Sequence, residues 1–316
     1  MATVAGQGTT FNLPNYHGEL FTITPTETPF LSAIGGLNAA KKTTATQFEW
    51  QTIDRRASSA GNAALEGAAA PAGAERARAN VTNVVEIHHS AIEISYTRLA
   101  ARGNFAGANI APEWDDAVLD ELAIQTTAEL ESMAVDIEQS FLTGVYAKPA
   151  DNLTPRKTRG LLTAITTNVT AVAGPVTKAA VDGLLTKIFN SGGKLPTAST
   201  VFLMGATQKV NFSNLYSTAT LNQPTFTRNI GGVAIDTVVT DFGTFGVMVD
   251  RWMPAGVLAV VDLSNCYPVF LEIPGKGLLF TEEIARTGSA RKFQLYGEVG
   301  LEYGAEQFHG QLTGLT

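Results

Sequence analysis

The sequence predicts an α+β fold, in which one long helix lies beside β-strands and a second unit mixes helices and strands. Three observations support this class. Residues 112–143 place apolar side chains at helical spacing, and residues 84–96 alternate apolar and polar side chains, as a strand with one buried face does. Residues 175–262 combine a capped helix with several strand-like runs. The 316 residues are enough to bury a substantial core, as one large domain or two closely joined ones.

The composition favours a protein that assembles with other chains. Charged residues make up 16% of the sequence, against about 25% in a typical soluble domain. Such a chain often hides much of its surface in subunit contacts, although some monomeric β-rich proteins share this bias. The net charge of −7 argues against nucleic-acid binding driven by bulk electrostatics.

Cysteine usage and targeting signals add further limits. Cys266 is the only cysteine in the sequence, which excludes an internal disulfide and a cysteine-based metal cluster. Residues 1–14 lack the basic and apolar regions of a secretory leader, and no run of about 18 apolar residues predicts a membrane span. We therefore expect synthesis in a reducing cytoplasm and no membrane partner.

Residues 1–45 predict an irregular N-terminal arm. Gly, Thr, Asn and Pro dominate it, yet large apolar side chains are spread along it, and a purely disordered tail carries fewer of these. We expect the arm to lie along a partner surface, with a short helical turn near residues 29–34.

Residues 46–97 predict an extended β-hairpin. Strand-like runs at residues 48–53 and 84–96 flank a tip, residues 57–80, which is built from small and polar side chains with Leu65 as its only large apolar one. An isolated two-stranded hairpin is at best marginally stable in water. We therefore expect the hairpin to rest on another copy of the chain.

The clearest helix in the sequence spans residues 112–143. Pro112 suits the first helical turn, acidic side chains near the start favour the positive end of the helix dipole, and Gly144 ends the helix. At 1.5 Å per residue the helix would be roughly 48 Å long, which is long for a globular protein. We interpret it as a structural spine.

The remaining elements follow in order. Thr177 is placed to cap a helix that continues to Ser191, with Phe189 on its apolar face. Strand-like runs and one further short helix then occupy residues 200–204, 205–215, 233–240, 245–252 and 257–261. Strands at residues 267–273 and 277–281 lead to a predicted hairpin formed by residues 291–301 and 302–312. We expect these last strands to pair with the base of the first hairpin, beside the long helix.

No constellation of side chains predicts an enzyme. Residues 241–243 copy a kinase tripeptide without the other kinase motifs, and residues 274–277 lack the spacing of a phosphate-binding loop. The adjacent His88 and His89 point to opposite faces of a strand, so they cannot easily share a metal ion. We expect no catalytic residue, no cofactor and no metal, and we expect Cys266 to be buried.

One charge pattern suggests contacts between subunits. Residues 113–147 contain nine acidic side chains and no basic one, whereas the hairpin region carries several arginines. A solvated helix face is the simpler interpretation. The alternative is an arginine-bearing arm that lies over the acidic helix of a neighbour and sets its register. The candidate contact residues are Trp50, Arg55, Arg56, Arg76 and Arg78 on the hairpin, and Asp120, Glu129 and Asp136 on the helix.

Several short strings carry a resemblance to a known family. They are ITPTETPFLSAIG at residues 23–35, FEWQT at residues 48–52, and three C-terminal strings at residues 290–292, 296–302 and 308–310. Together, in this order, they resemble the major capsid proteins of tailed bacteriophages, which have the Hong Kong 97-type fold. The resemblance covers the whole chain.

This resemblance implies a specific arrangement. An N-terminal arm (1–45) would precede an extended E-loop hairpin (46–97). A peripheral domain would follow, made of residues 98–174 and 263–316 and built on a spine helix at 112–143, with an axial domain at 175–262. Copies of the chain would form pentamers and hexamers that tile an icosahedral shell.

The resemblance also implies partners and location. The shell would enclose double-stranded DNA without sequence-specific binding, would contact a portal protein and separate scaffolding or decoration proteins, and would be assembled in the bacterial host cytoplasm as part of the virion. Residues 43–147 contain no lysine, so the covalent E-loop cross-link of some relatives is not expected. Two alternatives stay open: an encapsulin-like compartment shell with the same fold, and an enzyme housed in residues 175–262.

Overall fold

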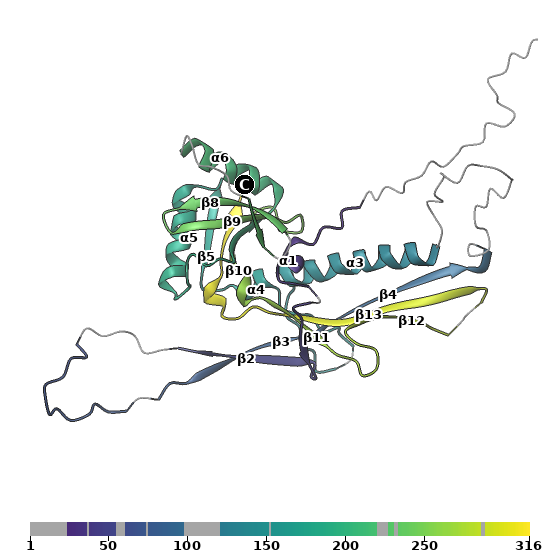
Figure 1. Cartoon of the computed structure of the whole chain (residues 1–316), viewed down its shortest axis with the longest axis horizontal. Coiled ribbons are helices and arrows are strands. Elements are labelled where there is room, and N and C mark those ends of the chain that lie inside the picture. Colours follow the sequence, from purple (N-terminus) through teal and green to yellow (C-terminus); the bar gives the residue numbers. More distant parts are fainter. Residues whose placement is uncertain are drawn as a thin grey trace, which may run out of the picture.

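Two β-sheets, a long helix that lies along one of them and a projecting hairpin make up the chain (Figure 1). The computed structural model describes residues 24–36, 38–54, 61–73, 75–97, 121–151, 153–219, 227–230, 233–285 and 288–316. The larger sheet and its helices form a rounded unit. The long helix and the smaller sheet extend away from this unit in one direction, and the hairpin extends in the other (Figure 1).

The smaller sheet supports the long helix. Its strand order is β1–β11–β13–β12, and β4 also pairs with β13. The two longest strands, β4 (Glu86–Ser95) and β13 (Ala290–Glu302), are antiparallel partners from Ala290↔Ser95 to Val299↔Glu86. The other strands are β1 (Lys41–Thr43), β11 (Tyr267–Leu271) and β12 (Leu279–Glu283). Helix α3 (Glu121–Thr143) contacts β4 and β13 (Figure 1). The sequence predicted that the C-terminal strands lie beside the long helix.

The inner face of α3 is mainly apolar, and a tightly packed glycine follows its last residue. Met133, Ile137 and Phe141 are buried in the core between the helix and the sheet. The helix ends at Thr143 as predicted. Only glycine fits at the next position, because a Cβ atom on Gly144 would lie 2.4 Å from the carbonyl oxygen of Ser140 and 2.6 Å from that of Thr158. The described helix has 23 residues. The predicted start of the spine at residue 112 lies outside the described residues.

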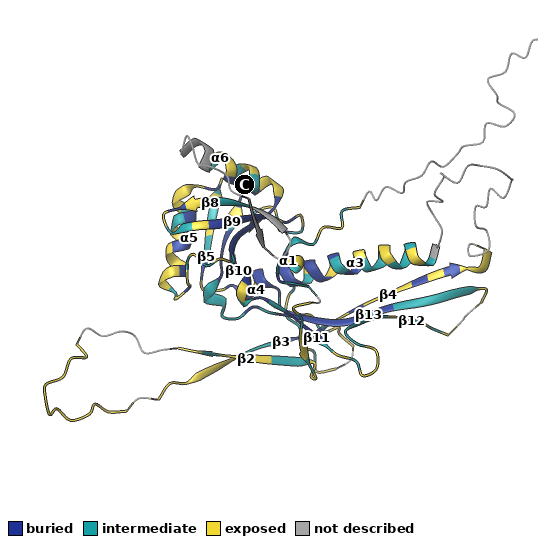
Figure 2. Cartoon of the chain, viewed as in Figure 1, coloured by how far each residue is buried: buried dark blue, intermediate teal, exposed yellow. Residues whose placement is uncertain are grey.

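The larger sheet has seven strands in the order β5–β14–β10–β6–β9–β8–β7. Their bounds are β5 Val169–Gly174, β6 Thr200–Met204, β7 Thr227–Ile230, β8 Val233–Thr240, β9 Gly243–Val249, β10 Leu258–Asp262 and β14 Gly310–Leu315. All five residues of β6 and of β10 are buried, so these strands lie at the centre of the unit (Figure 2).

Short helices cover this sheet and connect the two sheets. The Oγ1 atom of Thr177 accepts a hydrogen bond from the amide of Ala180 and caps α5 (Lys178–Asn190), as predicted. Phe189, however, is 57% exposed. Its neighbour Ile188 lies on the buried face of α5 instead. The remaining helices are α1 (Pro29–Ala33), α4 (Leu161–Ala164), α6 (Ala206–Ala219), η1 (Leu263–Asn265) and η2 (Glu306–Phe308).

The hairpin pairs differently from the prediction. Strand β2 (Gln47–Ile53) pairs with β3 (Arg78–Val84), which begins inside the predicted tip, and of the predicted partner run 84–96 only Val84 pairs with it. The alternating run does form β4, but β4 belongs to the smaller sheet. The two strands separate at Val84 and Val85, which are consecutive and both buried, so the alternation of faces breaks at that point.

The end of the chain also differs from the prediction. Residues 291–301 and 302–312 do not form a hairpin, because β13 stays in the smaller sheet whereas β14 inserts between β5 and β10 of the larger one. The sheet of the predicted 175–262 unit therefore draws in β5 and β14 from outside that range. Long-range pairing decides both placements, and the local pattern of side chains contains no signal for it.

Candidate subunit-contact surfaces

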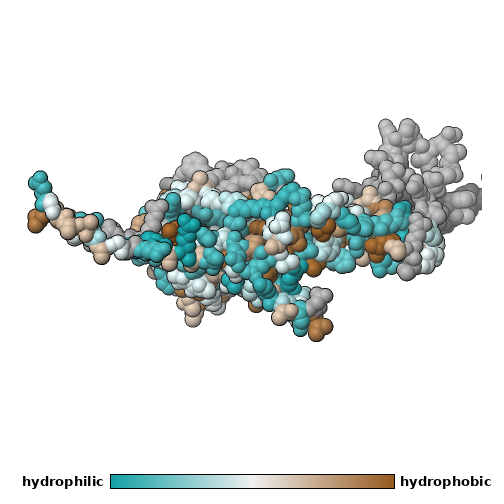
Figure 3. Space-filling view, turned by 90° about the horizontal axis from the view of Figure 1, so that it is seen from below, coloured by the Kyte–Doolittle hydropathy of each residue, from teal (hydrophilic) through white to brown (hydrophobic). Residues whose placement is uncertain are grey.

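The hairpin tip is exposed to solvent along its whole described length. All residues from 61 to 73 are exposed, and Leu65 is 87% exposed (Figure 2). The hairpin projects from the body as a narrow arm, on which hydrophobic and hydrophilic residues are mixed (Figure 3). A two-stranded ribbon without a packed face gains little stability by itself, so the tip is available for contact with another molecule.

The root of the hairpin, by contrast, is firmly attached to its own chain. The indole N–H of Trp50 donates to the carbonyl oxygen of Gly304 at 2.6 Å, and the ring meets Tyr303 edge-on at 4.9 Å. The ring of Phe48 lies so close to Gly300 that a Cβ atom there would be 2.7 Å from it. These contacts of Trp50 lie within one chain, and a role for this residue between subunits stays a prediction.

A buried asparagine completes the attachment of the root. Asn83 in β3 is fully buried, and its amide nitrogen donates to the carbonyl oxygen of Leu301 at 2.7 Å. Its side-chain oxygen accepts from the amides of Arg159 and Val84 at 2.8 and 2.9 Å. One side chain therefore satisfies backbone groups of three separate segments.

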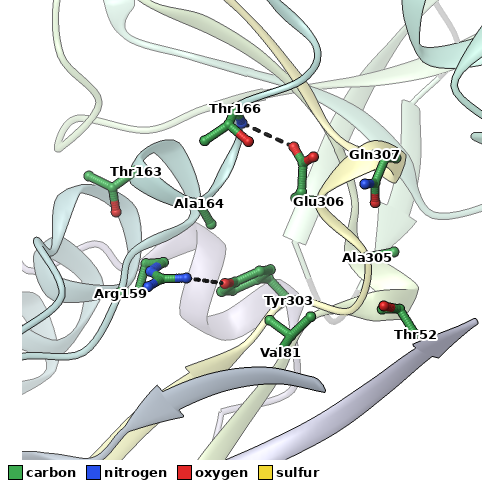
Figure 4. A pocket seen from close by; sticks show the side chains of 10 residues that line it. All are labelled: Thr52, Val81, Arg159, Thr163, Ala164, Thr166, Tyr303, Ala305, Glu306 and Gln307. Atoms are coloured by element: carbon green, nitrogen blue, oxygen red, sulfur yellow. Dashed lines mark hydrogen bonds between the residues drawn. The ribbon is translucent and has the colours of Figure 1, made fainter. Parts of the chain in front are cut away.

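A cavity of about 470 Å³ lies beside this root (Figure 4). Its polar lining is tied to the protein: Arg159 donates to the hydroxyl of Tyr303 at 3.3 Å, and Glu306 accepts from the amide of Thr166 at 3.0 Å. Burial raises the pKa of Glu306, but hydrogen bonds from Thr167 and Thr166 outweigh it, and the pKa lies below its usual value. The lining groups thus hold the joint together and form no reactive cluster.

The charged residues that were predicted to pair lie on two elements, the hairpin and α3, which are far apart within one chain. Arg76 and Arg78 are exposed on the hairpin, and Arg78 donates to the side-chain oxygen of Gln51 at 3.2 Å. Glu129 accepts a hydrogen bond from the Ser90 hydroxyl of β4. The hairpin and α3 point in different directions (Figure 1), so pairing between them requires two copies. Three further predicted residues, Arg55, Arg56 and Asp120, lie outside the described residues.

Asp136 is the more exposed of the two described acidic candidates, but its surroundings still shift its pKa. Burial, followed by the negative charge of Glu129, raises the pKa of Asp136 above its usual value. The two carboxyl groups are seven residues apart on α3, so they lie on the same side of the helix two turns apart. A basic partner on this side would relieve their repulsion.

One group that organises the N-terminal segment was not predicted from the sequence. Glu138 was counted among the acidic residues of a solvated helix, yet it is fully buried and accepts hydrogen bonds from the amides of Phe30 and Leu31 at 2.7 and 2.6 Å. Phe141 and Leu142, three and four residues further on, are fully buried too. This spacing, which places Glu138 on the apolar face, was the available signal.

The described residues contain neither a metal-binding cluster nor a membrane-spanning helix. Within the described ranges, no three His, Cys, Asp or Glu side chains are grouped so that they could hold a metal ion. The helices in that same part of the chain include none with the length and apolarity needed to cross a membrane. As predicted, Cys266 is buried, and burial raises the pKa of its thiol far above the usual value.

Comparison with known families decides the class of this chain. The family model of the SU10 major capsid protein matches residues 3–316. This chain belongs to the SU10 major capsid protein family. No curated protein sequence matches it.

Solved structures agree with this SU10-family assignment. The capsid of cyanophage A-1(L) has a TM-score of 0.64 at 13% identity, covering 96% of this chain and 97% of the other. The capsid of a native GTA particle has a TM-score of 0.61 at 16% identity, covering 100% and 99%. The holo-SrpI encapsulin of Synechococcus elongatus PCC 7942 has a TM-score of 0.59 at 11% identity, covering 97% and 93%.

The fold of this SU10-family protein is therefore the Hong Kong 97-type fold of phage capsids, and the protein is a major capsid protein of a tailed phage that resides in the virion. The predicted family is confirmed. At identities this low the solved structures establish the fold alone, and the structure of the virion around this chain is a matter for proposal.

Proposed function

We propose that copies of this chain form pentamers and hexamers that close into an icosahedral shell around double-stranded DNA. The hairpin, as the E-loop, would lie on a neighbouring copy. The observation that carries this proposal is the contrast along the hairpin: the root is tied to its own chain through Trp50 and Asn83, whereas the tip at residues 61–73 is fully exposed. A rigid root directs the tip outward, and the tip gains contacts only from another molecule.

The other elements fit the remaining parts of this design. In the proposal, α3 is the spine helix of a peripheral domain built on the smaller sheet, and the seven-stranded sheet is the core of an axial domain that meets its copies at the symmetry axes. The N-terminal arm extends the contacts of the hairpin. Many weak contacts of this kind add up to a strong shell, because each one raises the effective concentration of the next.

The proposal also includes partners outside the chain. A portal protein, and separate scaffolding or decoration proteins, would join the shell during assembly in the host cytoplasm. DNA would be enclosed without sequence-specific contacts, in keeping with a chain of net charge −7 that lacks a bulk electrostatic means of binding nucleic acid.

Deleting residues 61–73 tests the role of the hairpin. This deletion spares the whole of β2 and β3, so we expect folded subunits that no longer close into stable particles. Electron microscopy and sedimentation of the purified chain measure the outcome. A matched control shortens an exposed segment elsewhere, residues 274–277 between β11 and β12, which should leave assembly intact. Normal particles from the hairpin deletion would refute the proposed role.

The second candidate is an encapsulin-like compartment, which the likeness to the holo-SrpI encapsulin favours. The two functions differ in content and not in fold. Nuclease-treated particles from cells that make the complete phage should retain double-stranded DNA if the shell is a virion head. Particles filled with a cargo protein and free of DNA would instead support the compartment.

A further inference from the structure

One buried histidine joins the two segments in which the C-terminal half of the chain crosses between the sheets. Strand β10 of the larger sheet ends at Asp262 and leads through η1 into β11 of the smaller sheet, whereas β13 leads through Tyr303 and η2 into β14. His309 directly precedes β14 and has 0% exposure. Its Nδ1 atom accepts from the amide of Asp262 at 3.2 Å, and its Nε2 atom lies 2.8 Å from the carbonyl oxygen of Tyr303. The ring therefore connects both crossings.

The two partners of the ring fix its protonation state. A backbone amide can only donate a hydrogen bond, and a backbone carbonyl can only accept one. Nδ1 must therefore present a lone pair to Asp262, and Nε2 must carry a hydrogen toward Tyr303, so His309 is neutral. A second proton would have to go on Nδ1, where it would face the N–H of Asp262. The ring can thus be protonated only when it moves away from this amide.

Two carboxylates near the ring are already bound by other donors. Asp262 accepts from the hydroxyls of Ser199 and Ser264 at 3.0 and 2.7 Å, and from the side-chain amide of Asn265 at 2.8 Å. Glu306 in η2 accepts from two backbone amides that precede β5, at 3.0 and 3.1 Å. Burial is the largest influence on the pKa of the histidine and lowers it below its ordinary value, although the hydrogen bond to the carbonyl and these two charges act in the opposite direction.

The cations on neighbouring elements are engaged elsewhere. Lys187 on α5, a helix that packs against β14, donates to the carbonyl oxygen of Val169 at 3.1 Å and to the hydroxyl of Thr170 at 2.9 Å. Arg159 donates to the hydroxyl of Tyr303 at 3.3 Å, at the far end of that side chain from the carbonyl that meets the ring. Neither cation therefore takes the place of a proton on the ring.

We propose that His309 is an acid-sensitive tie between the two sheets: the neutral ring holds the two crossings together, and a ring that has taken up a proton cannot. A ring released into water binds a proton at the ordinary histidine pKa of 6.5, whereas the buried ring has a lower pKa. The tie is therefore at full strength above about pH 6.5 and weakens as the pH falls toward the lower pKa of the buried ring. It is a property of the single chain and does not depend on how the shell is arranged.

Other contacts keep the fold together when the tie is released. The side-chain amide of Asn168 donates to the carbonyl oxygens of Gln307 and His309 at 2.8 and 2.9 Å. The apolar core is shared by the two sheets, since it includes Val261 of β10 and Leu301 of β13. Acid should therefore loosen the crossings locally, as a partial opening, and leave the rest of the chain folded.

Hydrogen exchange of the full chain between pH 8 and pH 5, followed by mass spectrometry of peptides covering residues 258–268 and 301–310, tests the tie. After correction for the intrinsic exchange rate, protection of both segments should be constant from pH 8 to about pH 7. Below about pH 6.5 it should fall by up to about tenfold per pH unit, the dependence that uptake of one proton produces. Ordinary carboxyl groups titrate near pH 4, so this range isolates the histidine. Protection that stays constant to pH 5 would overturn the proposal.

The variant His309→Asn separates the tie from general acid loosening. Its side chain does not titrate, and its oxygen lies near the position of Nδ1, but the bond to Tyr303 is lost. Protection of the crossings should be lower than in the wild type at pH 8 and should not change between pH 8 and pH 5. His89→Asn, at an exposed ring on β4 that lies 3.3 Å from Gln294, is the matched control and should keep the wild-type profile. A fall of wild-type size in His309→Asn would overturn the proposal.

A third variant covers the case in which His309→Asn does not fold, and it tests the other buried histidine. His88 on β4 also has a pKa lowered by burial. In His88→Gln the two crossings should lose protection below about pH 6.5 as they do in the wild type. If the loss disappeared in His88→Gln, the acid response would belong to β4, and the role given to His309 would be wrong.

Discussion

The indole N–H of Trp50 in β2 and the carbonyl oxygen of Gly304, just beyond β13, lie 2.6 Å apart although 254 residues separate them in the chain. This bond fastens the hairpin to the end of β13, the strand that pairs with β4, β11 and β12 in the smaller sheet. The angle at which the hairpin leaves the body is therefore set by the smaller sheet. If the tip lies on a neighbouring copy, as proposed, this angle decides which surface of that copy it reaches.

Replacing Trp50 by Phe should weaken this joint. The aromatic contact with Tyr303 can persist, but the carbonyl of Gly304 loses its donor, which costs about 1 kcal/mol. Urea unfolding of purified subunits and hydrogen exchange of β2 measure the effect. Trp252→Phe removes a comparable indole bond far from the hairpin and should leave the exchange of β2 unchanged. Equal exchange of β2 in all three proteins would contradict the prediction.

Replacing Asn83 by Leu should be more damaging. Leucine keeps the branching of asparagine, but the backbone groups of Leu301, Arg159 and Val84 lose their partner, and each buried group left unsatisfied costs about 1–3 kcal/mol. We expect a loss of about 3 kcal/mol or more in the free energy of unfolding. Asn80→Ala, on the exposed part of the same strand, should stay within about 0.5 kcal/mol of the wild type. Similar losses in the two variants would argue against the role of Asn83.

Gly300→Ala should be destabilising for a steric reason. Its Cβ would lie 2.7 Å from the ring of Phe48 and 2.8 Å from the carbonyl oxygen of Val84, and overpacking of this kind typically costs about 1–3 kcal/mol. Gly183→Ala in α5 meets nothing within 4 Å and should stabilise the chain by up to about 1 kcal/mol, since alanine favours helix. Thermal unfolding of both variants tests the pair, and a neutral Gly300→Ala would be inconsistent with the packing described.

Reversing Arg76 and Arg78 to Glu tests whether charges guide subunit pairing. If the hairpin meets an acidic surface of its neighbour, the double variant should weaken particles at low salt and recover partly at high salt, because salt screens repulsion between exposed charges. Lys178→Glu combined with Lys194→Glu makes the same charge change on another element and is the control. If the double variant responded to salt as the wild type does, charge pairing between the hairpin and a neighbouring subunit would be contradicted.

The free energy of unfolding should depend on pH through Glu138. Its pKa in the folded chain is raised to about 9 from an ordinary value of 4.5. The stabilising contribution is therefore full below about pH 4.5 and is lost progressively as the pH rises to about 9, by at most about 1.4 kcal/mol per unit. Burial is the largest cause of this rise in pKa, and the negative charge of the buried Asp250 is the next. Denaturation of subunits across this range should therefore show a smaller decline in Asp250→Asn than in the wild type. Identical slopes would contradict this assignment.

Local pattern predicted the elements of this fold better than their partners. The alternation in residues 84–96 correctly indicated a strand, and the Thr177 cap and Gly144 correctly marked helix ends. The partner of β2 was wrong because alternation determines which face of a strand is buried but not which strand lies beside it. The position of β14 could not be predicted from local pattern, since its neighbours β5 and β10 are remote in sequence.

The candidate contacts show the same division. The exposed arginines of the hairpin were found because charge and small side chains identify a surface without any knowledge of the fold. The burial of Glu138 was missed because its hydrogen-bond partners, the amides of Phe30 and Leu31, lie more than a hundred residues away. A charged residue on the apolar face of a helix indicates a buried hydrogen-bond partner, but it does not tell which residue that partner is.

Strand β14 follows every other described strand in the chain, yet it lies between β5 and β10 in the larger sheet. A polypeptide that is still being translated, or that stops before Gly310, leaves two strand edges of that sheet open. Such a fragment would be a poor building block, because β5 and β10 would have no strand between them and the larger sheet would be split. A chain that lacks β14 should therefore be left out of particles, so the interior position of this strand selects against subunits truncated before it.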